Sequence, residues 1–175
     1  IWSELQRAAG ATERLVELLQ AEDSVTDPAA AQVLAEPVRG ELTFDNVSFT
    51  YPSRPDTSAL DQVQLTIQPG ETVAFVGPSG AGKTTIIQMI QRFYDPQSGE
   101  VRLDGVPLTA LSRGEFRRHI AMVPQEPIIL AATARENIRF GRPDASDAEV
   151  EAAAEAAAAH DFIMKLPEGY DAYVG

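Results

Sequence analysis

The sequence contains no cysteine, and this absence excludes a disulfide framework, a thiolate zinc site and a thiol nucleophile. Basic residues are also few: 14 Lys and Arg stand against 26 Asp and Glu, which gives a formal net charge of −12. This balance argues against an open basic surface, so nucleic acid is not an expected partner. No apolar run approaches the roughly 18 residues of a membrane span, and the N-terminus lacks the layout of a signal peptide. The chain is therefore not expected to cross a membrane itself.

The chain does contain enough apolar material for one domain. Its 175 residues are 44% hydrophobic, which suits a single α/β domain with a buried core. It begins with Ile1 rather than Met and stops at "GYDAYVG" without a closing element. We expect it to be a segment of a longer protein.

The first 40 residues indicate a helix followed by a linker. Apolar side chains between residues 1 and 20 fall on one helical stripe, with the charges elsewhere. Such an amphipathic helix needs a partner surface. Residues 21–40 carry Pro28 and Pro37 with little periodicity, which is typical of a linker laid over a surface. A domain boundary near Gly40 follows.

The next segments predict strands. "ELTFDNVSFTY" alternates apolar and polar residues, with a phase slip at Asp45-Asn46 that predicts a bulge or a turn. Residues 73–76 are continuously apolar and predict a buried strand.

Later segments predict a hairpin and then helices. "GEVRLDGVPL" predicts a short hairpin that turns at Asp104-Gly105, and residues 120–123 predict another apolar strand. From residue 131 onward the pattern is helical, with a capping box at Ser146 and Glu149.

The clearest motif is "GPSGAGKTT", residues 77–85, which satisfies the G-x-x-x-x-G-K-[ST] pattern of a phosphate-binding loop. It lies between the apolar segment 73–76 and the amphipathic segment "KTTIIQMIQRFY". In that setting, successive backbone N–H groups and the positive end of a helix converge on one anion. A nucleoside triphosphate with Mg²⁺ is the expected ligand.

Each residue type in this loop has a physical role. Glycines let the backbone curve around phosphate oxygens, Lys83 supplies a mobile positive charge, and the Thr84 hydroxyl can bind Mg²⁺. The residues expected to hold the nucleotide here are Gly77, Pro78, Ser79, Gly80, Ala81, Gly82, Lys83, Thr84 and Thr85.

The loop alone would fit kinases, GTPases, helicases and transport ATPases, but its neighbours are more specific. "FTYPSRPD", residues 49–56, precedes it, and "VPQEP", residues 123–127, follows it. With "GEVRLDG", "TARENIRFG" and "DFIMKLPEGYDAYVG" in the same order, the sequence resembles the nucleotide-binding domain of an ABC transporter. The resemblance is to the exporter type, in which membrane and nucleotide domains share one chain.

This resemblance implies an α/β fold: a phosphate-loop NTPase core with an N-terminal antiparallel β subdomain and the start of a helical subdomain. Residues 1–20 would be a connector helix from the membrane domain and 21–40 a linker. Residues 41–130 would form the ATP-binding core, and 131–175 the incomplete helical subdomain. The chain would be truncated before the signature loop.

The resemblance also implies roles for single residues. Tyr51 would stack its ring on adenine, as an exposed aromatic face can. Gln125 would reach Mg²⁺ and the attacking water, so that Gln125 and Lys83 are the candidate catalytic residues. The implied partners are a transmembrane domain and a second nucleotide-binding domain, identical or different, with ATP held between the two. The implied location is the cytoplasmic face of a membrane, in the first place the bacterial inner membrane.

Three parts that follow this segment in the family are missing: a signature loop of the LSGGQ type, an apolar strand ending in Asp-Glu, and a switch histidine. "LSRGEFRR" is not the signature loop, because it precedes the Gln125 loop and places Arg113 where glycine is needed. We therefore expect weak binding of Mg-ATP at most and hydrolysis near background. We also expect that the phosphate-loop strand exposes an unpaired edge.

Two other functions stay open at this point. One is a different phosphate-loop NTPase, such as a kinase or GTPase with its own acceptor. The other is a non-catalytic interaction fragment whose helices bind a partner. The transported substrate and the type of dimer cannot be read from these residues.

Overall fold

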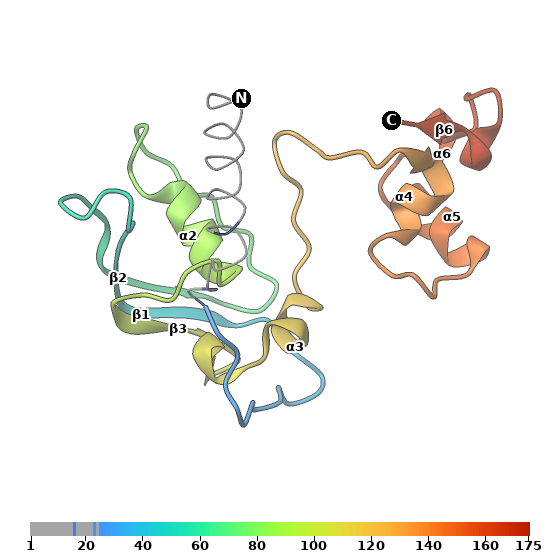
Figure 1. The fold of residues 1–175 in the computed structure, drawn as a ribbon. Coiled ribbons are helices and arrows are strands. Elements are labelled where there is room, and N and C mark those ends of the chain that lie inside the picture. Colours follow the sequence, from blue (N-terminus) through green and yellow to red (C-terminus); the bar gives the residue numbers. More distant parts are fainter. Residues whose placement is uncertain (1–15, 17–22, 24) are drawn as a thin grey trace, which may run out of the picture. The chain divides into compact units, whose positions relative to one another are not determined.

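The computed structural model describes Val16, Asp23 and residues 25–175, which fold into two compact units divided between Ala121 and Met122, called unit 1 and unit 2 (Figure 1). The amphipathic helix predicted for residues 1–20 lies almost entirely outside the described residues. Among the helices that are described, none combines the length and apolar character needed to span a bilayer. The domain borders expected from the sequence stay predictions.

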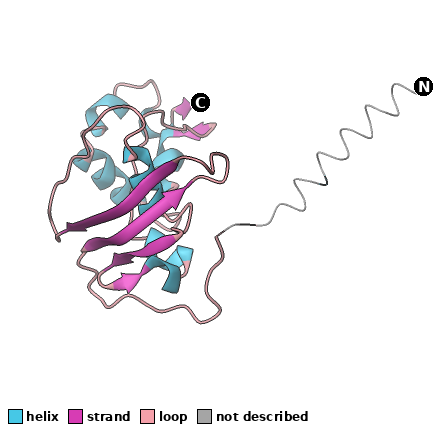
Figure 2. Ribbon diagram, turned by 90° about the vertical axis from the view of Figure 1, so that its left-hand side faces the viewer, coloured by secondary structure: helices cyan, strands magenta, loops and turns pink. Residues whose placement is uncertain are grey.

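Unit 1 is built on a four-stranded sheet formed by β1 (Leu42–Thr50), β2 (Ser58–Ile67), β3 (Ser98–Leu103) and β4 (Val106–Pro107). The strand order is β2-β1-β3-β4, and every neighbouring pair is antiparallel (Figure 2). The predicted α/β fold with an antiparallel β subdomain is therefore confirmed.

Two irregularities of this sheet were predicted by the sequence. The register between β1 and β3 shifts between Asp45 and Ser48, where Asn46 has a φ of 50°, so the phase slip is a bulge. The hairpin between β3 and β4 turns at Asp104 and Gly105, with φ angles of 48° and 81°. Both central residues have positive φ, as a two-residue type I′ turn requires.

One hydrophobic core joins this sheet to α2 (Lys83–Ile90), the 3₁₀ turn η1 (Leu108–Ala110) and α3 (Arg113–Arg117). Met89 of α2 and Phe116 of α3 are buried in the same cluster as Phe44 of β1. Leu34 from the preceding linker is also buried there, so the linker lies against this unit. The fully or nearly buried members are Leu34, Phe44, Val47, Phe49, Leu60, Met89, Val101, Leu103, Leu108, Leu111 and Phe116.

Two predicted strands are wrong. Residues 73–76 and 120–123 have no regular secondary structure, and Val76 and Val123 are 87% and 95% exposed. A strand forms only where its backbone N–H and C=O groups bond to a neighbouring strand. Among the described residues, no strand pairs with either segment. Local apolar character was therefore not enough to make them strands.

Unit 2 is mainly helical, with α4 (Ala134–Arg139), α5 (Asp147–Ala156) and α6 (His160–Ile163). A short antiparallel pair, β5 (Ala132–Thr133) with β6 (Tyr173–Val174), joins its two ends, and the 3₁₀ turn η2 (Gly169–Asp171) precedes β6. Its small core consists of Ala134, Val150, Ala154, Ile163 and Tyr170.

The capping box predicted at Ser146 and Glu149 is confirmed. The Ser146 hydroxyl accepts a hydrogen bond from the Glu149 N–H at 3.4 Å, and the Glu149 carboxylate accepts one from the Ser146 N–H at 2.8 Å. The Ser146 N–H is the main reason that the pKa of Glu149 lies below its ordinary value of 4.5. A second capping box, Thr133 with Glu136, starts α4.

Ser146→Ala should lower the free energy of unfolding by about 1 kcal/mol, because an N-cap hydroxyl is lost. Urea unfolding followed by far-UV circular dichroism measures this change, and Ser53→Ala, at an exposed loop serine, is the control. Since the folded pKa of Glu149 is lowered, its stabilising effect is complete above about pH 4.5 and is lost as the pH falls through the folded value. The difference between parent and variant should therefore shrink in acid. An equal loss in both variants would contradict the capping role.

Candidate functional site

The phosphate loop, residues 77–85, leads directly into α2, which begins at Lys83. Gly82 is the N-cap residue of α2, and no side chain caps the helix there. The first turn also contains no acidic residue. The N–H groups at the start of α2 are therefore available to a bound anion, and the helix dipole favours negative charge at this end.

Gly82 is required by space as well as by backbone conformation. Its φ is +81°, and a Cβ atom at this position would lie 2.7 Å from the Ala59 carbonyl oxygen and 3.0 Å from Leu60 Cδ2. The loop thus packs directly on the backbone of β2. This close approach fixes the position of the loop relative to the sheet.

The side chain of Lys83 lies over the loop. Its Nζ donates hydrogen bonds to the carbonyl oxygens of Gly77 at 2.8 Å and Pro78 at 2.7 Å. These contacts hold the ammonium group beside the backbone that is expected to surround the phosphates. A terminal phosphate oxygen could replace either carbonyl as its acceptor.

A cavity of about 510 Å³ lies beside the loop. This volume is in the usual range for small-molecule sites. Most of the residues predicted from the sequence line it, namely Tyr51, Ser79, Gly80, Ala81, Gly82, Lys83, Thr84 and Thr85. Four lining residues were not predicted: Arg54, Thr57, Ser58 and Ala59. Arg54 lies within the segment "FTYPSRPD". Its position in that segment was the only feature of the sequence that could have predicted its place in the cavity.

Tyr51 is fixed in this cavity by both its hydroxyl and its ring. The hydroxyl donates to Gln88 Oε1 at 2.6 Å and lies 3.0 Å from the buried Thr85 hydroxyl. The ring makes edge contacts with Phe49 and Tyr94, at centroid distances of 4.9 and 5.4 Å. The tyrosine is therefore joined to the helix that carries the phosphate loop.

Gln125 lies in unit 2, in an exposed segment without regular secondary structure. Its predicted role at the magnesium ion stays a prediction. The described residues contain no group of three or more His, Asp or Glu side chains that could hold a metal ion by themselves. A magnesium ion at Thr84 would therefore depend on phosphate oxygens for further ligands, which is usual for this cation.

A glycine loop that opens a helix beside a cavity of this size defines a phosphate-loop nucleotide-binding domain. The family model described as ABC transporter matches residues 60–170. The chain belongs to the ABC transporter family.

Named relatives agree with this assignment. The chain is 42% identical over 169 residues to ABC transporter B family member 1 of Arabidopsis thaliana. The aligned region covers 97% of this chain and 13% of that protein. It is 45% identical over 163 residues to ATP-binding cassette sub-family B member 6 of Mus musculus, covering 93% of this chain and 19% of that protein. The chain thus spans less than a fifth of the length of these two relatives.

A solved structure is similar over nearly the whole chain. It is described as a bacterial Atm1-family ABC exporter with ATP bound, and it matches with a TM-score of 0.86 and 38% identity. The match covers 97% of this chain and 29% of that one. The sequence resemblance to an exporter nucleotide-binding domain is therefore confirmed.

Proposed function

We propose that the cavity beside residues 77–85 binds Mg-ATP as part of an ABC exporter. The observation that carries this proposal is the cavity itself, which brings Tyr51 together with the phosphate loop and the start of α2. An aromatic ring and an anion site on one cavity match the two ends of a nucleotide. The similar exporter structure is described as having ATP bound.

Each part of the nucleotide has a proposed partner. Tyr51 stacks on the adenine, and the backbone N–H groups of residues 77–85 surround the phosphates. Lys83 neutralises charge on the terminal phosphates, and the Thr84 hydroxyl binds Mg²⁺. In the complete protein, Gln125 would help to hold Mg²⁺ and would orient the attacking water. A magnesium ion held by Thr84 would supply positive charge that stabilises the phosphate oxygens.

For the complete protein we propose ATP hydrolysis coupled to export across a membrane. The names of the similar proteins support this proposed activity, because they describe transporters and an ABC exporter. The proposed partners are a transmembrane domain and a second nucleotide-binding domain. The proposed location is the cytoplasmic face of a membrane, in a bacterial inner membrane or a eukaryotic membrane. Similar proteins come from both kinds of organism.

For residues 1–175 in isolation we propose weak binding of Mg-ATP without normal turnover. No apolar segment of the sequence ends in an Asp-Glu pair, and no LSGGQ loop is present. Phosphoryl transfer depends on a carboxylate-organised metal ion and a positioned water. An ATPase assay that finds turnover typical of complete transporters would contradict this proposal.

Two substitutions of Tyr51 test the nucleotide site. Tyr51→Ala removes the ring and should weaken binding of a fluorescent ATP analogue about ten-fold or more, because stacking contributes about 1–3 kcal/mol per base. Tyr51→Phe keeps the ring but removes the contacts to Gln88 and Thr85, and should cost much less affinity. Anisotropy titration measures both affinities.

The control is Tyr173→Ala, at a tyrosine in unit 2 that is 66% exposed. It should bind the analogue like the parent chain. Parent-like affinity of Tyr51→Ala would show that Tyr51 does not contact the base. Equal losses in the Phe and Ala variants would show that Tyr51 acts through its hydroxyl rather than through stacking.

A further inference from the structure

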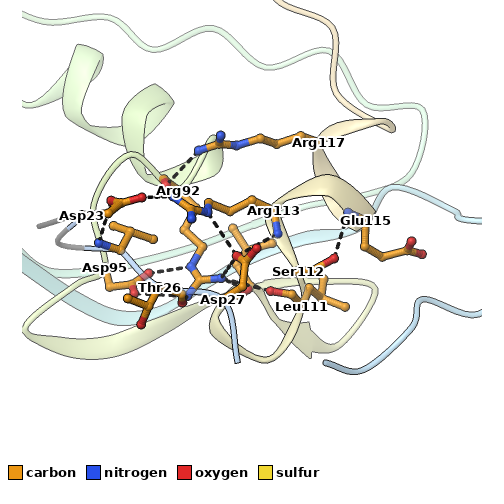
Figure 3. Close-up of polar contacts among 12 residues, drawn as sticks. Asp23, Thr26, Asp27, Arg92, Asp95, Leu111, Ser112, Arg113, Glu115 and Arg117 are labelled. Atoms are coloured by element: carbon orange, nitrogen blue, oxygen red, sulfur yellow. Dashed lines mark hydrogen bonds and ion pairs between the residues drawn. The ribbon is translucent and has the colours of Figure 1, made fainter. Parts of the chain in front are cut away.

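A buried arginine follows the helix that carries the phosphate loop. Arg92 is only 3% exposed. Its Nε donates to Asp95 at 2.8 Å, while its terminal nitrogens donate to the carbonyl oxygens of Leu108 at 3.1 Å, Leu111 at 3.0 Å and Thr26 at 2.9 Å (Figure 3). One guanidinium group thus joins the end of α2, the turn η1 and the segment that precedes the sheet.

The backbone of Arg92 is in a conformation that usually selects glycine. Its φ is 51°, and its N–H donates to the Met89 carbonyl while the Phe93 N–H donates to the Gln88 carbonyl, both at 3.0 Å. These two bonds form the Schellman motif that ends many helices, in which the left-handed position is normally glycine. An arginine at such a position indicates that its side-chain contacts offset an unfavourable backbone.

A second arginine holds the same N-terminal segment. The N–H and Nε groups of Arg113, at the start of α3, donate to Asp27 at 3.0 and 3.1 Å, and its terminal nitrogen pairs with Asp23 (Figure 3). The hydrogen bond from the Arg113 side chain is the main reason that the pKa of Asp23 lies below its usual value. The hydrogen bond from the Arg113 N–H is the main reason that the pKa of Asp27 is lowered as well. We call Asp23, Thr26, Asp27, Arg92 and Arg113 the arginine clasp.

The arginine clasp is linked to the phosphate loop by one short helix. Lys83 begins α2, Ile90 ends it, and Arg92 follows within two residues. A third side chain, Arg117 of α3, donates to the carbonyl oxygens of Gln91 and Arg92 at 3.0 and 3.1 Å. Because a helix of this length is stiff, a shift at its start is carried to its end.

We propose that the arginine clasp couples the position of segment 23–27 to nucleotide binding at the phosphate loop, so that this segment and α2 move together. The inference rests on the proposed function, because it assumes that the loop binds ATP. Coupling between two sites is reciprocal. If ATP binding stabilises the contacts of the arginine clasp, an intact clasp must in turn strengthen ATP binding.

Because the chain has no cysteine, a single nitroxide can be attached through Thr26→Cys, whose native side chain is exposed. Electron paramagnetic resonance then reports how mobile segment 23–27 is. Arg113→Gln should make the label more mobile than it is in the parent. The control is Arg118→Gln at the opposite end of the same helix, where Arg118 pairs with Glu36 and Glu115 outside the clasp. Circular dichroism verifies that each variant remains folded.

ATP binding completes the test. Addition of Mg-ATP should further immobilise the label in the parent but not in Arg113→Gln, and Arg113→Gln should bind the fluorescent ATP analogue at least about two-fold more weakly. A label equally immobile in Arg113→Gln and the parent would overturn the clasp. A parent that binds the analogue without any change in the label would overturn the coupling alone. A parent that does not bind the analogue would overturn the proposed function and, with it, the coupling.

Discussion

Lys83→Ala is expected to weaken ATP binding by about ten- to a hundred-fold, because each hydrogen bond to a charged group contributes about 1.5–3 kcal/mol. The Lys83 ammonium already lies at the loop, 2.8 Å from the Gly77 carbonyl and 2.7 Å from the Pro78 carbonyl. Since both contacts are with backbone, alanine should leave the fold of unit 1 in place. Titration with a fluorescent ATP analogue, together with circular dichroism, separates affinity from folding.

The sequence offers a matched control for this prediction. Its only other lysine is Lys165, which is exposed in unit 2. Lys165→Ala changes the net charge by the same amount and should leave the affinity unchanged. A similar loss in both variants would attribute the effect to overall charge rather than to a contact with phosphate. Unchanged affinity in Lys83→Ala would rule out the proposed role of the loop.

Gly99→Ala is expected to lower the free energy of unfolding of unit 1 by about 3 kcal/mol or more. Gly99 has a φ of +74°, and a Cβ atom there would lie 2.3 Å from the carbonyl oxygens of both Asp45 and Asn46. These are the residues of the β1 bulge, so neither atom can move without disturbing the central strand. Urea unfolding measures the loss as a shift in midpoint at constant slope.

Gly105→Ala is the control, because it separates the effect of the clash from that of the backbone conformation. Gly105 has a φ of +81° but no atom within 4 Å of its hypothetical Cβ. Its replacement should cost only about 1 kcal/mol, the price of an L-residue with positive φ. If both variants lost the same free energy of unfolding, the close approach of Gly99 to the β1 bulge would not contribute to the effect.

Features that depend on local residues could be predicted from the sequence. The phase slip at Asp45-Asn46 is a bulge, Asp104-Gly105 is a hairpin turn, and Ser146 with Glu149 is a capping box. In each case, neighbours in the sequence determine the backbone conformation or satisfy its hydrogen bonds. The phosphate loop belongs to the same group, because its glycines, lysine and hydroxyls are consecutive.

Features that depend on distant residues could not be predicted in this way. Residues 73–76 have the composition of a buried strand but no strand partner among the described residues, and composition does not supply one. The hydrogen bond from Tyr51 to Gln88 and that from Arg92 to Thr26 join residues far apart in the sequence. Sequence periodicity shows that such side chains are polar or aromatic but does not identify their partners.

The strand order of unit 1 also affects how the polypeptide folds during synthesis. In β1, Leu42 lies opposite Ile67 of β2 on one side and Leu103 of β3 on the other. β1 therefore has an unpaired edge until the ribosome has released Leu103, by which time the whole phosphate loop and α2 have emerged. Nascent chains shorter than this can form the β1–β2 hairpin but not the complete sheet. The phosphate loop is thus translated before β3, the strand that pairs with the second edge of β1.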